Sequence, residues 1–309
     1  MDPLVYETKT VNGVDLEVAV ANPGGERGLA LLVHGFPELA FSWRFQIPML
    51  AEMGYEVWAP NTRGYRGSSK PPKVSDYSID ELLADLAGLI DQSGHERVTL
   101  VAHDWGAVQA WMFAIRTVRP LERLVIMNVP HPTCAQRELR RWRQLRKSWY
   151  IFFFQIPKLP EWALTRDGAK AVGEAFTGST GDPSRFPAEV VGEYRSAAQQ
   201  PGAMTAMLNY YRALVRGARK ARKEVLPPIE TPTLMIWGED DIALSKETTD
   251  GTDEYVTDLT LRFLPGVSHW VQQEAPEKVN AMLAAWLNGE PVPEADEIEQ
   301  DRLPDPALG

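Results

Sequence analysis

The sequence has little that would cross-link it or anchor it in a membrane. It contains one cysteine, Cys134, in 309 residues, so a disulfide within the chain is excluded. Its longest apolar cluster, residues 149–156, is far too short to span a bilayer. The chain does not begin with a basic stretch followed by an apolar one, so no signal peptide is expected. We therefore expect a cytoplasmic protein with no membrane partner.

An excess of positive charge is also lacking. The 32 Lys and Arg residues are outnumbered by 42 Asp and Glu residues, and the formal net charge of −10 argues against a nucleic-acid partner. Basic residues are concentrated only in residues 137–147 and 216–223. A solvated surface is the favoured interpretation of both segments, and a partner, a membrane surface or an anionic substrate is the alternative.

The residue patterns of metal and nucleotide sites are missing as well. The five histidines show no spacing typical of metal ligands. The glycine-containing stretch at residues 64–67 lacks the Gly-Lys-Ser/Thr ending of a phosphate loop. We expect neither a metal nor a cofactor.

Short apolar runs alternate with helical patterns along most of the chain. Asn12-Gly13 separates two strand-like runs and predicts a hairpin, and Ser78 begins a capping box ahead of a helix. The alternation stops after residue 130, gives way to a helix-like stretch rich in Arg and aromatic residues, and resumes with a strand at residues 233–237. Repeated strand–helix units predict an α/β fold, with a mostly parallel sheet covered by helices on both faces.

The interruption defines the expected domain organisation. Residues 1–130 and 229–290 would form one α/β core, and residues 131–228 a helical insertion. Residues 291–309 are acidic and contain prolines, with little to bury, and we expect them to form a mobile tail.

The stretch around Asp104 has the layout of a nucleophile elbow. A buried strand at residues 98–101 precedes it, a helix follows, and the small residues Ala102 and Gly106 lie two positions to either side. Such a sharp strand-to-helix turn needs small neighbours so that its central side chain can project. The usual occupant is serine, and here it is an aspartate.

Two further groups follow strands later in the chain. His269 comes after the last predicted strand, and Asp240 and Asp241 come after the strand at residues 233–237. Nucleophile, acid and histidine in this order match a hydrolase triad, with the choice between the two aspartates left open. His103, next to the nucleophile, is interpreted as support for the elbow or as a pocket residue.

An aspartate nucleophile restricts the substrate. Attack on an ester would give an anhydride, whereas attack on an sp³ carbon that carries a strained or good leaving group gives an alkyl ester. A water activated by the histidine–aspartate pair could then hydrolyse that ester, with the backbone N–H groups of Phe36 and Trp105 stabilising the oxyanion. Asp104 therefore predicts cleavage of an epoxide C–O bond or of a carbon–halogen bond.

Four motifs extend this prediction. The sequences His34-Gly35-Phe36-Pro37-Glu38, Phe41-Ser42-Trp43-Arg44, Gly64-Tyr65-Arg66-Gly67-Ser68-Ser69 and His103-Asp104-Trp105-Gly106 resemble those of α/β-hydrolase-fold epoxide hydrolases of the soluble type. The resemblance covers nearly the whole chain except the tail. It implies a core of eight strands with a helical cap inserted after the sixth. It also implies Asp104 as nucleophile, His269 as general base and Asp241 as its orienting acid.

The resemblance further implies two cap tyrosines that donate to the epoxide oxygen. Tyr150 and Tyr211 match their sequence contexts, and Tyr210 is the weaker choice beside Tyr211. A phenol stays protonated at neutral pH and can give a proton to a forming alkoxide. The expected substrate-binding residues are Phe36, Pro37, Trp105 and Phe154. The expected substrate is a small apolar epoxide, with water as the second reactant.

Two other functions remain as alternatives. A haloalkane or haloacid dehalogenase would use the same Asp-His-Asp triad, although Phe36 offers only its backbone to a halide and Trp105 stands where haloacetate dehalogenases usually have arginine. A non-catalytic small-molecule receptor on the same fold is the other. The oligomeric state is open, with a homodimer as one alternative.

Overall fold

The computed structural model describes residues 4–138, 146–221, 226–299 and 302–306. Its centre is an eight-stranded sheet with the strand order β1-β2-β4-β3-β5-β6-β7-β8. The pairs β1–β2 and β2–β4 are antiparallel, and all pairs from β4 to β8 are parallel. The strands are β1 (Val5–Val11), β2 (Val14–Glu26), β3 (Leu29–Val33), β4 (Tyr55–Pro60), β5 (Val98–His103), β6 (Arg123–Met127), β7 (Thr233–Gly238) and β8 (Leu259–Leu264). The predicted mostly parallel sheet is confirmed.

The β1–β2 hairpin forms where the sequence predicts it. Val11 pairs with Val14 across the turn. Asn12 and Gly13 have φ angles of 46° and 72°, the positive values that a tight two-residue hairpin turn requires. Asparagine and glycine adopt these values at low cost, so the turn residues set the register of the hairpin.

Helices cover both faces of the sheet. Helices α1 (Gln46–Glu52) and α11 (Pro276–Leu287) pack on one face, and α2 (Ile79–Ser93) and α3 (Trp105–Ile115) on the other. The predicted N-cap of α2 is present, because Ser78 Oγ accepts a hydrogen bond from the backbone N–H of Glu81. Because β3 to β7 lie between two helical layers, nearly all of their side chains are buried.

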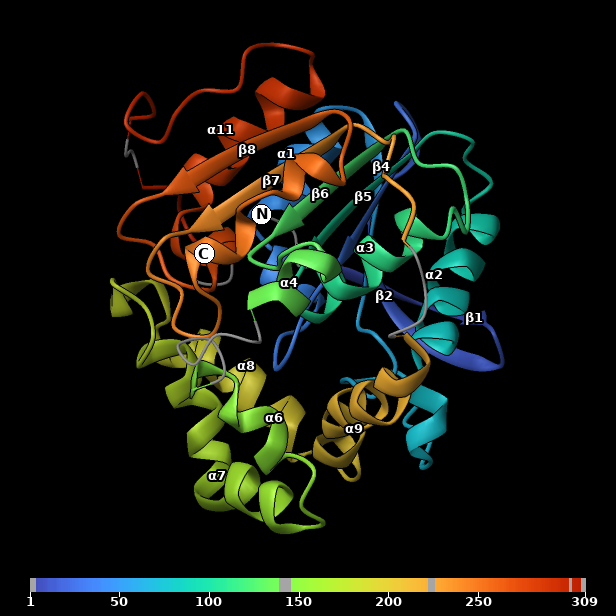
Figure 1. Ribbon diagram of the computed structural model, residues 1–309, viewed down its shortest axis with the longest axis vertical. Coiled ribbons are helices and arrows are strands. Elements are labelled where there is room, and N and C mark those ends of the chain that lie inside the picture. The colour runs from blue at the N-terminus through green and yellow to red at the C-terminus, as the bar shows by residue number, and fades with distance from the viewer. Residues whose placement is uncertain (1–3, 139–145, 222–225, 300–301, 307–309) are drawn as a thin grey trace.

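The described chain between β6 and β7 is helical, which confirms the predicted insertion after the sixth strand. We call this part the cap; it contains α4 (Pro132–Glu138), α6 (Trp149–Phe153), α7 (Leu159–Thr177), α8 (Ala188–Gln199) and α9 (Ala203–Ala221). Figure 1 shows the sheet in the upper half of the molecule and α6 to α9 in the lower half. The remaining short elements are α10 (Val271–Glu274) and the 3-10 helices η1 (Ala40–Trp43), η2 (Val74–Tyr77), η3 (Pro183–Arg185), η4 (Lys246–Thr249) and η5 (Thr252–Glu254).

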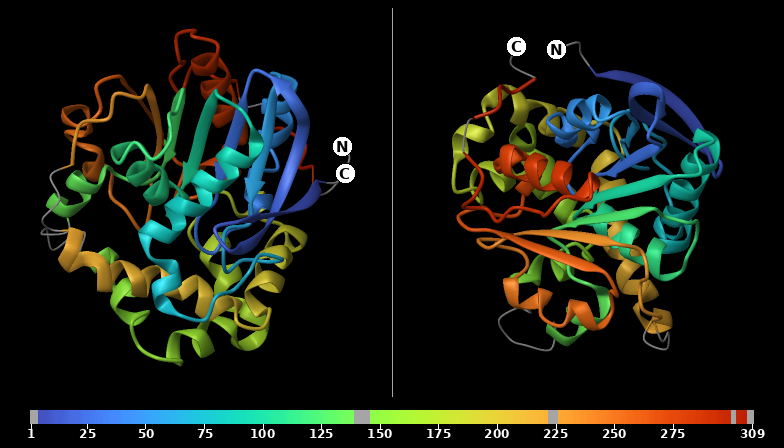
Figure 2. Two further views of the ribbon diagram at one scale, coloured as in Figure 1. Left: turned by 90° about the vertical axis from the view of Figure 1, so that its right-hand side faces the viewer. Right: turned by 90° about the horizontal axis from the view of Figure 1, so that it is seen from above.

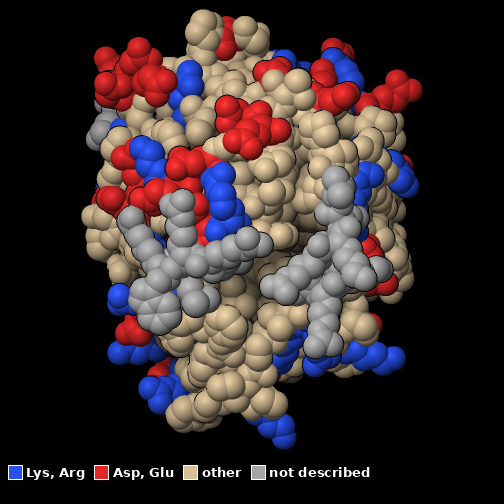
Figure 3. Space-filling view, in the orientation of Figure 1, with Lys and Arg blue, Asp and Glu red and all other residues tan. Residues whose placement is uncertain are grey.

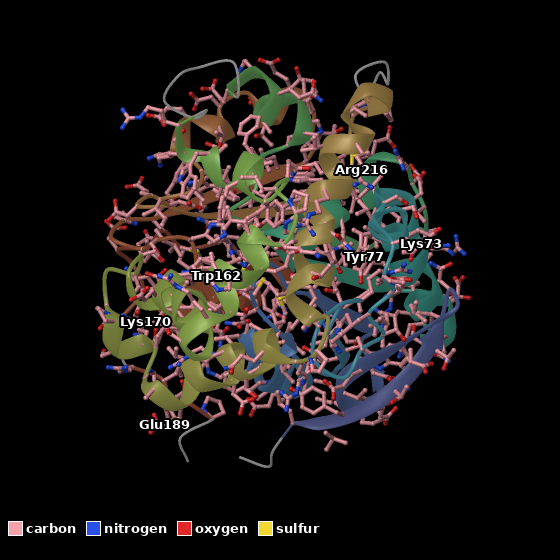
Figure 4. All side chains as sticks on the ribbon, turned by 90° about the horizontal axis from the view of Figure 1, so that it is seen from below. Lys73, Tyr77, Trp162, Lys170, Glu189 and Arg216 are labelled. Atoms are coloured by element: carbon pink, nitrogen blue, oxygen red, sulfur yellow. The ribbon has the colours of Figure 1, made fainter. Side chains whose placement is uncertain are left out.

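The outer surface of the cap differs in charge from the core. Figure 3 shows acidic side chains mainly over the upper half of the molecule and basic side chains along the lower rim of the cap. Trp162, Lys170 and Arg216 lie on the cap face seen from below in Figure 4. Residues 139–145 of the first basic segment and 222–223 of the second lie outside the described residues. No helix of the described chain is both long enough and apolar enough to cross a membrane.

The C-terminal segment differs from the expectation of a tail that buries little. Val292 and Ala295 are buried against the layer that contains α1 and α11. Further along, Asp305 forms an ion pair with Arg44, which is itself buried. These contacts have a physical reason: two small apolar side chains leave water by packing on the core, and a buried guanidinium needs a counter-charge.

Candidate active site

Asp104 lies at the turn between β5 and α3, with φ 45° and ψ −118°. This is a strained backbone conformation for a residue with a side chain, and it persists only where the surroundings enforce it. The turn also needs its glycines. A Cβ at Gly106 would lie 2.0 Å from the carbonyl oxygen of Val33, and one at Gly35 would lie 2.3 Å from Cβ of Asp104. The elbow predicted from small flanking residues is therefore formed by close contact with the end of β3.

The Asp104 carboxylate is partly buried and held by a backbone donor. The N–H of Phe36 donates to Oδ1 at 2.7 Å. The N–H of Trp105 belongs to the first turn of α3, where amides have no partner within the helix. Burial alone would raise the pKa of Asp104, but its contact with His269 and the charges of His269 and His103 hold that pKa below its ordinary value. Asp104 is therefore a carboxylate at neutral pH.

His269 lies between two carboxylates. Its Nδ1 is 2.6 Å from Oδ2 of Asp241, and its Nε2 is 3.6 Å from Oδ2 of Asp104. Burial alone would lower the pKa of His269, but the charge of Asp241 and the contacts with both carboxylates raise it well above its ordinary value. Of the two aspartates left open by the sequence, the structure brings Asp241 to the histidine, while Asp240 is exposed.

Asp241 is fixed by donors from two directions. The backbone N–H groups of Ala243 and Leu244 donate to its Oδ1 at 2.7 and 2.9 Å, and Nδ2 of Asn128 donates to its Oδ2 at 2.8 Å. Burial would raise the pKa of Asp241, but the charge of His269 and these donors lower it. Asn128 was not singled out by the sequence analysis. The sequence feature that could have indicated Asn128 is that a polar residue directly follows the buried strand β6.

A second histidine–carboxylate pair lies beside the triad. His103 Nδ1 is 2.6 Å from Oε2 of Glu38, and its Nε2 is 2.8 Å from the carbonyl oxygen of His269. Glu38 also accepts hydrogen bonds from the backbone of Gly35 and from the amide groups of Gln272 and Gln273. The interpretation of His103 as structural support agrees with these contacts. The roles of Glu38 and the two glutamines were not anticipated, because their partners are far apart in sequence.

Tyr150 of α6 and Tyr211 of α9 come from the cap, with ring centroids 5.9 Å apart. The pKa of each is raised well above that of a free tyrosine, first by burial and next by the negative charge of Asp104. Both phenols therefore stay protonated. The hydroxyl of Tyr210 instead donates to the carbonyl oxygen of Arg63 at 2.8 Å. The hydroxyl of Tyr210 is thus bound to the backbone of Arg63, which agrees with Tyr210 being the weaker candidate of the two.

Aromatic rings line the space around Tyr211. Its ring centroid lies 4.9 Å from that of Phe154, 5.0 Å from Trp105 and 5.4 Å from Phe36. Pro37, which follows Phe36 through a cis peptide bond, is buried. The residues expected to bind substrate are brought together as an apolar surface next to Asp104. Across the described ranges, no three His, Cys, Asp or Glu side chains are grouped so that they could hold a metal ion.

Comparison with known proteins identifies the family of the chain. A family model described as alpha/beta hydrolase fold matches residues 30–276. The AB hydrolase superfamily protein YfhM of Bacillus subtilis is 38% identical over 293 residues, covering 94% of this chain and 100% of the relative. Epoxide hydrolase A of Mycobacterium tuberculosis is 34% identical over 309 residues, covering 90% of this chain and 95% of the relative.

Solved structures give the same assignment. An epoxide hydrolase of Bacillus megaterium, in complex with an inhibitor, has a TM-score of 0.81 at 31% identity and covers 91% of this chain and 100% of its own. A variant of a Bacillus megaterium epoxide hydrolase has been solved with its product, a naphthyloxy-propane-1,2-diol. The chain therefore belongs to the α/β-hydrolase-fold family. Within that family it is one of the epoxide hydrolases, which confirms the resemblance drawn from the sequence motifs.

Proposed function

We propose that the chain hydrolyses an epoxide to a vicinal diol through an ester of Asp104. In the first step, a carboxylate oxygen of Asp104 attacks an epoxide carbon and the C–O bond breaks. The electron pair stays on the leaving oxygen, which takes a proton from Tyr150 or Tyr211. The main support is the ionised Asp104 at a strained elbow, near enough to two protonated phenols for its charge to raise the pKa of both.

In the second step, water attacks the carbonyl carbon of the ester while His269 takes its proton. The oxyanion that forms would be stabilised by the N–H groups of Phe36 and Trp105, the first of which already donates to Asp104. Collapse of this intermediate breaks the acyl C–O bond, and the leaving oxygen takes the second proton of the attacking water, which releases the diol and restores the carboxylate. The proton on His269 then returns, through solvent, to the tyrosine that gave up its own in the first step. Asp241 keeps Nδ1 of His269 paired during the transfer.

The charge of Asp104 couples the two steps. In the free enzyme that charge helps to raise the pKa of His269. Formation of the ester removes the charge, so the histidine becomes a better proton acceptor when hydrolysis requires one. The nucleophile thereby prepares the general base for the second step.

The substrate class we propose is an apolar epoxide. The surface beside Asp104 is formed by the rings of Phe36, Phe154 and Trp105, and an apolar, aromatic surface suits an aryl or alkyl group. The Bacillus megaterium variant's product, an aryloxy diol, is of the same kind. The tyrosine pair favours an alkoxide leaving group over a halide, which needs no proton.

Trapping the ester tests the proposal. A His269→Gln variant, incubated with styrene oxide, is expected to gain the mass of one epoxide on the peptide that contains Asp104, because the ester forms but is not hydrolysed. Asp104→Asn should gain none. The proposal is wrong if the adduct forms on another peptide, or if wild-type protein releases bromide from a bromoalkane but leaves styrene oxide unchanged.

A further inference from the structure

The C-terminal segment at residues 302–306 joins the cap to the core. Arg302 donates from Nη1 and Nη2 to the side chain and the carbonyl oxygen of Ser184, which lies in η3 of the cap. The N–H of Leu303 donates at 2.8 Å to Glu277 at the start of α11, and Glu277 also pairs with Arg185 of η3. Leu4 and Pro306 line the same surface groove, and Figure 2 shows this end of the chain beside the start of β1.

Asp305, in the same segment, pairs with a buried arginine. Its two carboxylate oxygens accept hydrogen bonds from Nε and Nη2 of Arg44 at 2.9 to 3.1 Å. Arg44 is 2% exposed, so its charge depends on a partner of opposite sign. The remaining nitrogen, Nη1, donates at 2.7 Å to Oε1 of Gln273.

The contact with Arg44 fixes which way the Gln273 amide faces. Its Oε1 accepts hydrogen bonds from Arg44 and from the hydroxyl of Tyr194, and its Nε2 donates at 2.9 Å to Glu38. Arginine can only donate, so the amide oxygen must face it and the amide nitrogen must face the carboxylate. Displacement of Arg44 would remove one of the two donors that hold the amide oxygen, and would so loosen the alignment of the amide nitrogen with Glu38.

Glu38 connects this chain of contacts to the catalytic loop. Its other oxygen lies 2.6 Å from His103, which in turn contacts the carbonyl oxygen of His269 at 2.8 Å. Each contact in the series is direct, from Asp305 through Arg44, Gln273, Glu38 and His103 to the backbone of His269. The series ends at the general base of the proposed reaction, next to the nucleophile.

We propose that Asp305 is a positioning residue for the active site. By holding Arg44, it keeps the Gln273 amide and the Glu38 carboxylate aligned, and these fix His103 and the loop that carries His269. The catalytic part of this inference rests on the proposed function. The structural part is that the positions of His103 and His269 depend on Asp305, and this part does not rest on the proposed function.

The structural part is tested by NMR on the free protein. Asp305→Asn is expected to move the ring resonances of His103 and His269, and Asp305→Glu, which keeps the carboxylate, should largely restore them. The matched control is Asp296→Asn, which makes the same substitution at an exposed position earlier in the tail. Unchanged His103 and His269 resonances in folded Asp305→Asn would overturn the proposal.

The catalytic part is tested by the kinetics of ester formation and hydrolysis with styrene oxide. Asp305→Asn is expected to slow hydrolysis of the ester about tenfold with little change in KM, because the general base is misplaced. Asp305→Glu should recover most of the rate, and Asp296→Asn should match wild type. Equal rates of ester hydrolysis in Asp305→Asn and Asp296→Asn would contradict a positioning role. If wild type forms no ester, the proposed function fails instead, and the NMR result still decides the contact series.

Discussion

His103 Nδ1 lies 2.6 Å from Oε2 of Glu38, and solvent reaches neither side chain. Two more hydrogen bonds, from Gln272 and Gln273, satisfy the other oxygen of the carboxylate. A buried carboxylate is stable only when its oxygens are paired with hydrogen-bond donors, and both oxygens of Glu38 are. The pair therefore supports the catalytic loop through the contact of His103 with the carbonyl oxygen of His269.

Glu38→Gln is expected to lower the free energy of unfolding by about 3 kcal/mol, because it leaves buried donors without acceptors. Urea denaturation measures the change, and Glu96→Gln, at an exposed loop position, is the control. Burial alone would raise the pKa of Glu38, but the charge of His103 lowers it. The contribution of Glu38 is thus present above the ordinary glutamate pKa and lost as the pH falls through the lower folded value. A pH-independent difference between variant and wild type would contradict this.

Asp104→Asn should lower the pKa of His269 by about one unit or more, because a negative charge next to the imidazolium is removed. An NMR titration of the histidine ring measures it. The wild-type pKa is expected to be above the ordinary histidine value. An unchanged pKa in the variant would show that ester formation cannot activate His269 in the proposed way.

Asp241→Asn and Asp240→Asn are a matched pair. The first removes the charge 2.6 Å from His269 and should slow ester hydrolysis at least about 10²-fold, so that the alkyl-enzyme accumulates. The second changes an exposed side chain and should leave the rate unchanged. Rapid-quench mass spectrometry follows the intermediate. Loss of activity in Asp240→Asn alone would reverse the assignment.

Phenylalanine at Tyr150 or Tyr211 should slow epoxide opening at least about tenfold each, and the double variant about 10²-fold or more. Tyr210→Phe removes the hydroxyl that donates to Arg63 and should reduce stability rather than the rate of opening. Single-turnover kinetics separate the two effects. Full activity in the Tyr150/Tyr211 double variant would show that the leaving oxygen takes its proton elsewhere.

Gly106→Ala is expected to cost about 2 kcal/mol or more of stability, because its Cβ would meet the carbonyl oxygen of Val33 at 2.0 Å. Gly192→Ala in α8 meets no atom within 4 Å and should instead stabilise the protein by roughly 0.5–1 kcal/mol, since alanine is the better helix former. Thermal unfolding of both variants measures the contrast. Equal melting temperatures for the two variants would mean that the backbone around Gly106 can shift to make room for the added Cβ.

The sequence predicts those features that depend on local pattern. Apolar runs, Asn12-Gly13 and the Ser78 capping box specify strands, a hairpin and a helix start, and the small neighbours of Asp104 specify the elbow. The choice between Asp240 and Asp241 could not be made, because it depends on which side chain the loop after β7 turns towards His269. Asn128 acts through Asp241, 113 positions away, and Glu38 through His103 and Gln272, 65 and 234 positions away, which no local pattern records.

The contacts of the tail are also not predicted by local sequence pattern. An acidic, proline-containing segment is typical of a mobile tail when it is taken alone. The ion pair of Asp305 with Arg44 joins residues 261 positions apart, and it gives a counter-charge to a guanidinium that is buried just after η1. Arg44 needs the carboxylate of Asp305 because the fold buries its guanidinium, and the composition of the tail does not show this.

The most direct test of the proposed mechanism is a single turnover in ¹⁸O-water, with enzyme in excess over an unlabelled epoxide. The account predicts a first-turnover diol without ¹⁸O, because its new oxygen comes from the Asp104 carboxylate, and predicts that the label then appears in Asp104. A first-turnover diol that carries ¹⁸O would mean that water attacks the epoxide directly, and the covalent mechanism would be wrong.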